Sequence, residues 1–456
     1  MENVKNSRIG IDLTEGNVAV TLLRFAVPIL LTNLIQQFYS TVDLIVAGQF
    51  IGSIGTVGVS TGGEFAELLT FFSTGFASAG QIYIAQLCGS GSQERIRRAT
   101  GTLITFMLGM SLVFSAVLIL FSAPILHWQN CPQEAFAQAQ NYMTITALGF
   151  PFIFGYNAIC GILRGMGESK RPLLFISIAA TANIFMDVFL VVVIPLAVAG
   201  TAIATVIAQF ATFVASLAYL YRKRAMLGID FRLKSFAIHR AELLVLLKLG
   251  IPLSLQSVLI HFTQIYCNSL VNQYGLVASA TNSVGNKLFR FVNIIVTSLS
   301  QASGAVVGQN LGARKLDRVK ATVYVGLGFN FLICALNCIM VLLIPREIFS
   351  VFTEDPDVIA FGVVYLRVCI ITFILSAWMG PFGAVVTGAG NAALNLISGV
   401  LDGVVLRLGI SLFCAYVLNL GVIGFFLGNS LARLAPCIIN AVYFYSGKWK
   451  TCKLLS

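Results

Sequence analysis

Apolar runs long enough to cross a lipid bilayer recur along the whole chain, and they decide what it can fold into. About 20 mostly apolar residues span the hydrocarbon core of a membrane as an α-helix. We count about twelve such runs, at residues 22–47, 55–86, 100–122, 138–163, 173–195, 199–221, 246–273, 278–309, 320–344, 358–386, 392–417 and 421–445. Since lipid offers no hydrogen bonds to an open backbone, the sequence predicts an all-α protein with twelve transmembrane helices.

The composition agrees with a membrane environment. Apolar residues make up 57% of the chain and charged residues 10%, whereas soluble domains average about 25% charged residues. The polar residues 1–16 precede a first apolar run that is too long for a signal peptide, so we expect no cleavable leader.

The net charge of +11 does not indicate nucleic acid, because the basic residues of the loops lie almost entirely on one side of the membrane. They cluster before the first run and after runs 2, 4, 6, 8 and 12, and Arg346 is the exception in the alternate loops. This bias is the positive-inside rule, and it predicts a multi-pass protein of the cell membrane with both termini in the cytoplasm.

The chain contains an internal repeat. Residues 22–28 resemble residues 246–252, the segment at 86–89 with Arg95 resembles 309–312 with Arg318, and 164–167 resembles 387–390, all at an offset of 223 or 224. Each half holds six predicted spans, and an even number makes the two repeats parallel. We therefore expect an N-terminal lobe at 1–221, a cytoplasmic linker at 222–245 and a C-terminal lobe at 246–456.

Pro28 and Pro252 occupy equivalent places inside the first span of each half. Each proline removes one backbone hydrogen bond and kinks its helix. Bending points and static kinks are both consistent with this pattern.

Polar groups inside the spans of the first half point to one site. Asp43 lies in span 1, Asn183 and Asp187 share a face of span 5, and Thr205 lies in span 6. At ~1.5 Å per residue, Asp187 and Thr205 lie ~13 Å below the outer surface and Asp43 ~10 Å. An ionised Asp at the centre of a membrane helix costs ~2.5–3.5 kcal/mol on insertion scales. The acids therefore need a proton or a cation, and oxygen ligands suit a hard cation.

The second half differs at the corresponding place. Arg407 lies at the repeat position of Ile184, and no matching pair of acids is present. We expect Arg407 to form an ion pair with the nearby Asp402. The single predicted cation site therefore belongs to the N-terminal lobe. No histidine or cysteine spacing indicates a metal site.

Opposite charges occupy equivalent positions of spans 2 and 8. Glu64 and Glu67 correspond to Lys287 and Arg290 at the offset of 223. These residues could form salt bridges between the lobes in one conformation. Two alternatives remain open. The glutamates could attract a cationic substrate, or each charged residue could pair with a residue of its own lobe.

At these residues the chain resembles the multidrug and toxic compound extrusion (MATE) transporters. The likeness covers nearly the whole chain. In the first half, the matching segments are Pro28 with residues 33–43, which end at Asp43, then Ala85-Gln86 with Gly89, then Gly161-Ile162-Leu163-Arg164-Gly165-Met166-Gly167, and then Asn183-x-x-x-Asp187. In the second half, the matching segment is Gly308-Gln309-Asn310-Leu311-Gly312-Ala313.

The resemblance implies two six-helix lobes forming a V and export of small amphiphilic or cationic compounds, driven by inward flow of protons or sodium ions. In the prokaryotic branch, the coupling acids match Asp43 and Asp187, with Asn183 and Thr205 in support. The expected protein is a monomeric antiporter among membrane lipids, with no cofactor beyond the coupling ion. A flippase for lipid-linked saccharides, from the same superfamily, is the alternative. An integral-membrane enzyme ranks lower, because no catalytic cluster is visible.

Overall fold

The computed structural model describes residues 9–129, 131–227 and 231–451, and within these ranges it contains helices and no strand. Lys5, Arg8 and Lys453, which belong to the predicted basic clusters, lie outside them. The helices of the first half are α1 (Val18–Val46), η2 (Ala47–Ile51), α2 (Gly52–Ser90), α3 (Gln93–Leu120), α4 (Ser122–Trp128), α5 (Gln133–Leu148), α6 (Phe150–Gly165), α7 (Lys170–Val188), η3 (Phe189–Val193), α8 (Ala197–Arg222), α9 (Arg224–Leu227) and η4 (Leu233–Phe236).

The second half follows the same order. Its helices are α10 (Arg240–Asn272), α11 (Leu276–Gly312), α12 (Leu316–Leu343), α13 (Pro345–Ser350), α14 (Pro356–Gly388), α15 (Ala392–Val400), η5 (Leu401–Leu408), α16 (Gly409–Leu412), η6 (Phe413–Val417), α17 (Val422–Leu431), α18 (Leu434–Tyr445) and η7 (Lys448–Thr451). The segments η2, η3, η5 and η6 are π-helical, while η4 and η7 are 3₁₀ helices.

Eleven helices of the described chain are long and apolar enough to cross a membrane, and a bent pair brings the number to twelve. The bent pair is α5 and α6, which meet at 46°. The chain turns at Gly149, and Pro151, in the first turn of α6, has no N–H to continue the helix. At the offset of 223 these positions hold Thr372 and Ile374, inside the unbroken helix α14. The predicted span count is thus confirmed, with one span broken.

The repeat is also visible in the backbone. Left-handed φ values recur at the predicted offset of 223 or 224, at helix ends where the chain must reverse. The pairs are Gly52 (83°) with Gly275 (100°), Gly91 (73°) with Arg314 (56°), Gly167 (85°) with Gly390 (71°) and Ala197 (49°) with Gly421 (55°). Glycine reaches this region freely, whereas Arg314 and Ala197 do so at some cost in energy. The recurrence of the same backbone conformation at one offset therefore indicates two copies of one helical unit.

The described chain divides into two compact units. Among the described residues, unit 1 contains 9–12 and 27–254, and unit 2 contains 13–26 and 255–451. The boundaries therefore differ from those expected at 221 and 246. One lies inside α1, between Ala26 and Val27 and thus one residue before Pro28, and the other lies inside α10, two residues after Pro252.

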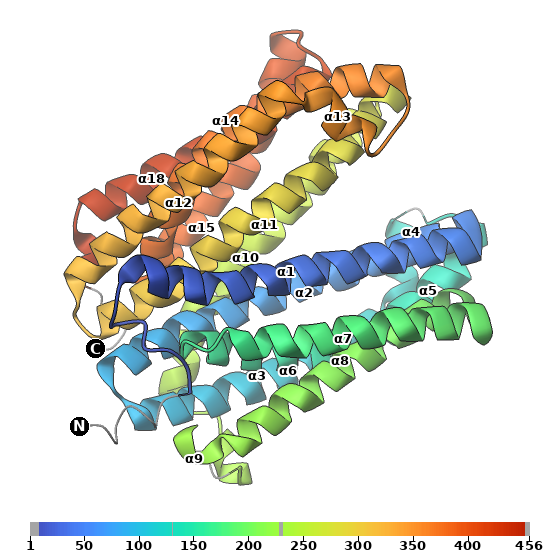
Figure 1. Ribbon diagram of the computed structural model, residues 1–456. Helices are drawn as coiled ribbons and strands as arrows, with labels where there is room; N and C mark the ends of the chain where they lie inside the picture. Colours follow the sequence, from blue (N-terminus) through green and yellow to red (C-terminus); the bar gives the residue numbers. More distant parts are fainter. Residues whose placement is uncertain (1–8, 130, 228–230, 452–456) are drawn as a thin grey trace. The chain divides into compact units, whose positions relative to one another are not determined.

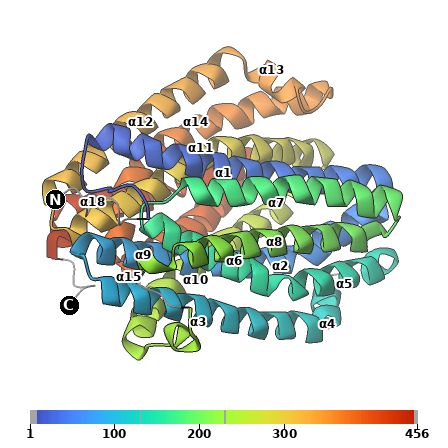
Figure 2. The ribbon, with the colours of Figure 1, turned by 60° about the horizontal axis from the view of Figure 1, so that its bottom comes forward.

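In unit 1, α2 packs against α5 and α6, and α7 packs along α8 (Figure 1). Figure 2 shows α4 at the end of α3, close to α5. In unit 2, α14 is the central helix, with α11, α12, α17 and α18 around it. Its core includes fully buried Phe349 and Phe382.

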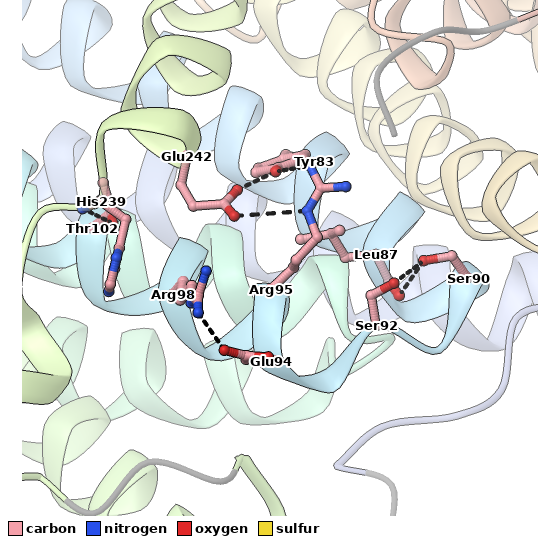
Figure 3. A network of polar contacts seen from close by, with 10 residues as sticks. All are labelled: Tyr83, Leu87, Ser90, Ser92, Glu94, Arg95, Arg98, Thr102, His239 and Glu242. Atoms are coloured by element: carbon pink, nitrogen blue, oxygen red, sulfur yellow. Dashed lines mark hydrogen bonds and ion pairs between the residues drawn. The ribbon is translucent and has the colours of Figure 1, made fainter. Parts of the chain in front are cut away.

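The first helices of the two repeats, α1 and α10, each have segments in both units, and an arginine at an equivalent position holds the start of each. In unit 1, Arg95 of α3 lies 3.7 Å from the carboxylate of Glu242, at the start of α10. Arg95 also donates to Tyr83, whose hydroxyl donates to Glu242 (Figure 3). In unit 2, Arg318 donates to the carbonyls of Glu15 and Gly16, just before α1. Each repeat thus holds the segment that leads into the other repeat's first helix.

Candidate cation-binding site

Two carboxylates of unit 1 each lie just before a π-helical segment. Asp43 is near the end of α1, where η2 begins at Ala47, and Asp187 is near the end of α7, where η3 begins at Phe189. The π-helix is rare, and single turns of it are frequent at functional sites, because the extra residue changes the direction of the flanking side chains. The local backbone is therefore specialised at both acids.

The structure brings Asp43, Asn183 and Asp187 together, as the sequence predicts. Asp187 is 0% exposed and Asn183 1%, while Asp43 is half-buried. The Asp43 carboxylate is close enough to Asp187 and Asn183 to interact with both. Oδ1 of Asp43, both oxygens of Asp187 and both amide atoms of Asn183 are nevertheless buried without a hydrogen bond of standard geometry within the described chain.

Two tyrosines complete this cluster, and the sequence analysis missed them. Tyr39 interacts with Asp43, and Tyr142 of α5 interacts with both acids and with Tyr39. Gln209 of α8 donates to the Tyr39 hydroxyl over 3.5 Å. Tyr39 could have been found, since it lies four residues before Asp43 on one helix face. No sequence signal singles out Tyr142.

Thr205 makes a local contact. Its hydroxyl donates to the carbonyl of Thr201, four residues earlier in α8, over 3.0 Å. Its predicted place beside the acids stays a prediction. Gln209 lies one turn further along α8, and its hydrogen bond to the Tyr39 hydroxyl connects this helix to the cluster.

The arrangement can hold one positive charge. Two carboxylates at close range in a medium of low dielectric repel each other strongly. A proton on one of them, or a cation between them, removes the repulsion. The carboxylate and amide oxygens offer the hard ligands that such a cation prefers. In the part of the chain that the structure describes, no group of three or more His, Cys, Asp or Glu could hold a metal ion.

The four predicted charge-pair residues lie on equivalent helices of the two units. Glu64 and Glu67 are exposed on α2 in unit 1, and Lys287 and Arg290 are exposed on α11 in unit 2. Their pairing between the lobes stays a prediction.

Unit 2 confirms the expected ion pair. Nη2 of Arg407 donates to Oδ1 of Asp402 over 2.9 Å, and both residues are buried. Arg407 also donates to Asn429. Both charged residues belong to the π-helix η5, whose i→i+5 hydrogen bonding brings residues five apart onto one turn. In an α-helix this spacing would point them to different faces.

Two parallel repeats of six spans, with buried charges inside the helical bundles, are the construction of a multi-pass membrane transporter. The chain belongs to the MatE family, whose sequence model matches it twice, at residues 28–189 and 252–420. The two matches begin at Pro28 and Pro252.

Several bacterial proteins resemble it over nearly their whole length. The "probable multidrug resistance protein YoeA" of Bacillus subtilis is 27% identical over 431 residues, 93% of each chain. YpnP of the same organism, with the same description, is 27% identical over 451 residues, 98% of this chain and 99% of its own. The "multidrug export protein MepA" of Staphylococcus aureus is 22% identical over 422 residues, 92% of each chain.

Solved structures share the fold. A transporter of the MOP superfamily from Pyrococcus furiosus aligns with a TM-score of 0.88 at 20% identity, covering 96% of this chain and 98% of its own. An outward-facing multidrug resistance MATE transporter aligns with the same score and identity, over 96% and 97%. The fold is therefore that of the MATE transporters.

Proposed function

We propose that this protein is a cation-coupled antiporter that exports small amphiphilic or cationic compounds across a bacterial cytoplasmic membrane. The pair formed by half-buried Asp43 and fully buried Asp187 carries this proposal, because two carboxylates with no cation bonded to them in the described chain create a demand for one proton or one sodium ion. Occupancy of the pair by the ion changes the buried charge of unit 1, and this change couples ion flow to export. The names of YoeA, YpnP and MepA support export of several drugs as the cargo class.

The distribution of positive charge supports a placement with both termini in the cytoplasm. The protein works in this proposal as a monomer, with no cofactor other than the coupling ion.

Transport by the purified protein in lipid vesicles tests the coupling. Vesicles loaded with acid or with sodium are diluted into a medium that lacks the gradient ion, and ethidium accumulation inside is followed by fluorescence. We expect one of the two gradients to drive accumulation, and Asp43→Asn and Asp187→Asn to reduce the initial rate at least tenfold, since an amide takes up neither a proton nor a cation charge.

Asp317→Asn is the matched control, because this carboxylate on α12 is fully exposed beside Lys320. It should transport at the wild-type rate. Gradient-driven accumulation at full rate by Asp187→Asn would overturn the coupling proposal.

We also propose that α1 and α10 bend at Pro28 and Pro252 during transport. The division between the units falls one residue before Pro28 and two residues after Pro252, so each helix has segments in both units. In the same vesicles, Pro28→Ala and Pro252→Ala should slow transport several-fold while ethidium binding is retained.

The predicted pair between the lobes is tested by reversing the charge of Glu64 and of Lys287. Either reversal alone should break the pair, and reversing both charges together should restore it.

A further inference from the structure

Arg433 lies where the last span of unit 2 is interrupted. α17 ends at Leu431 and α18 begins at Leu434, so Arg433 stands in the break between them. Pro436 contributes to the break, because it cannot donate a hydrogen bond to the carbonyl of Ala432. The whole stretch Val422–Tyr445 counts as one membrane span. An arginine at this depth is costly and points to a function.

The described contacts of Arg433 are with neutral groups. Its guanidinium donates to the hydroxyl of Ser376 and, over 3.2 Å, to Oδ1 of Asn293. The same group lies over the ring of Phe289, 5.1 Å from its centre. These contacts orient the arginine without neutralising it.

The carboxylate that acts on Arg433 electrostatically is already engaged. Asp402 and Arg407 both influence Arg433, but Asp402 is bonded to Arg407 at 2.9 Å. Buried Arg407, half-buried Arg433 and buried Asp402 together leave one positive charge in excess. Within the described chain, no carboxylate comes within ion-pair distance of Arg433. Lipid offers no counter-ion at that depth, so the excess charge calls for an anion.

A small cavity lies beside the groups that hold Arg433. Helices α11, α12 and α14 line it, and its polar lining includes Asn293, Ser376 and Asn330. It leaves about 10 Å³ for the centre of a water-sized sphere, which is room for one water or one small ion.

Asn330 supplies independent evidence for a ligand. This residue is 1% exposed, and neither its amide nitrogen nor its oxygen has a hydrogen-bond partner among the described residues. A buried amide left unpaired costs about 1–3 kcal/mol. Asn293 uses its oxygen for Arg433, which leaves its own NH₂ group as a donor. The cavity therefore presents N–H donors next to an uncompensated cation.

We propose that this cavity is an anion site, in which Arg433 and Asn330 bind a small monovalent anion or the carboxylate group of a larger molecule. The site lies in unit 2, apart from the acid pair, and it does not depend on the coupling proposal. A carboxylate accepts hydrogen bonds from both residues, and a chloride ion fits the same donors and the same charge.

Thermal unfolding of the full-length protein in detergent tests the site. Sodium chloride or sodium acetate replaces sodium methanesulfonate, a bulkier monovalent anion without a carboxylate group, at constant ionic strength. We expect the wild-type Tm to rise by about 2–4 °C and to saturate, since the ligand binds only the folded state. Arg433→Gln and Asn330→Leu should lose the response, while Arg367→Gln, an exposed arginine within α14, should keep it.

Asn330→Asp keeps the test decisive if Arg433→Gln does not fold, because it places a carboxylate in the cavity. This variant should be more stable than Asn330→Leu and insensitive to chloride. Displacement of chloride by benzoate but not by benzamide assigns the site to a carboxylate of a larger molecule, and a chloride response without competition assigns it to a free ion. The proposal is overturned if the wild type shows no anion dependence, or if Arg433→Gln and Asn330→Leu respond to the anion as strongly as the wild type.

Discussion

The two units use the same helices but treat buried charge in opposite ways. In unit 1, Asp43 and Asp187 lie close together, and no basic residue of the described chain is bonded to them. In unit 2, Asp402 is bonded to Arg407, and Arg433 is held by neutral groups. At the offset of 223 the two acids of unit 1 correspond to Tyr266 and Ile410. The two repeats therefore share one backbone fold but differ in these charged side chains. Among them, unit 1 has an excess of negative charge, and unit 2 has an excess of positive charge.

The same substitution should have opposite effects in the two units, and this is the largest difference we expect. Asp402→Asn leaves Arg407 buried without its counter-charge and should lower the free energy of unfolding by about 3–5 kcal/mol. Asp187→Asn removes one of two repelling carboxylates, so the free energy of unfolding should be unchanged or higher. Denaturant unfolding in detergent micelles measures both.

The double variant Asp402→Leu with Arg407→Met is the control for this comparison. Replacing both partners of a buried pair by apolar residues is often neutral or stabilising, so the double variant should regain most of the stability. If Asp402→Asn and Asp187→Asn destabilise the protein equally, the contrast between the units is wrong.

Close packing of helices gives a smaller difference. A Cβ at Gly161 of α6 would lie 2.4 Å from the carbonyl oxygen of Ala77 in α2, whereas the equivalent position in unit 2 is already Ala384. Gly161→Ala should therefore cost about 1–3 kcal/mol through overpacking. Gly109→Ala, at an open position of α3, should be neutral or stabilising by up to about 1 kcal/mol. Equal unfolding midpoints for the two variants would contradict the packing argument.

The sequence predicted the features that depend on local pattern. Apolar length gave the spans, the offset of 223 gave the repeat, and helical spacing put Asn183 and Asp187 on one face. The ion pair between Asp402 and Arg407 followed from proximity along the chain. Tyr142 and the break at Gly149 were missed, since the electrostatic interaction of an α5 side chain with α1 and the angle between two helices depend on tertiary packing. The π-helical turns were missed for the same reason.

The excess charge at Arg433 was also beyond the sequence. A single arginine in an apolar run does not reveal whether an acid from another helix reaches it. Only the positions of Asp402, Ser376 and Asn293 show that the available carboxylate is used elsewhere. The candidate cation site was thus predictable where an acid marks each helix at a similar depth, as Asp43 and Asp187 do. Neighbours from further helices that carry no such mark were not predictable.

The shared first helices have a consequence for the origin of the chain. Residues 13–26 belong with the second unit, and the start of α10 belongs with the first. Two separate copies of one ancestral repeat could reach this arrangement only by exchanging the leading half-helix, as in a domain-swapped dimer. Fusion of the two genes would have made the exchange permanent. Expression of the two halves as separate polypeptides, cut at the linker, should therefore yield folded protein only when both are made together.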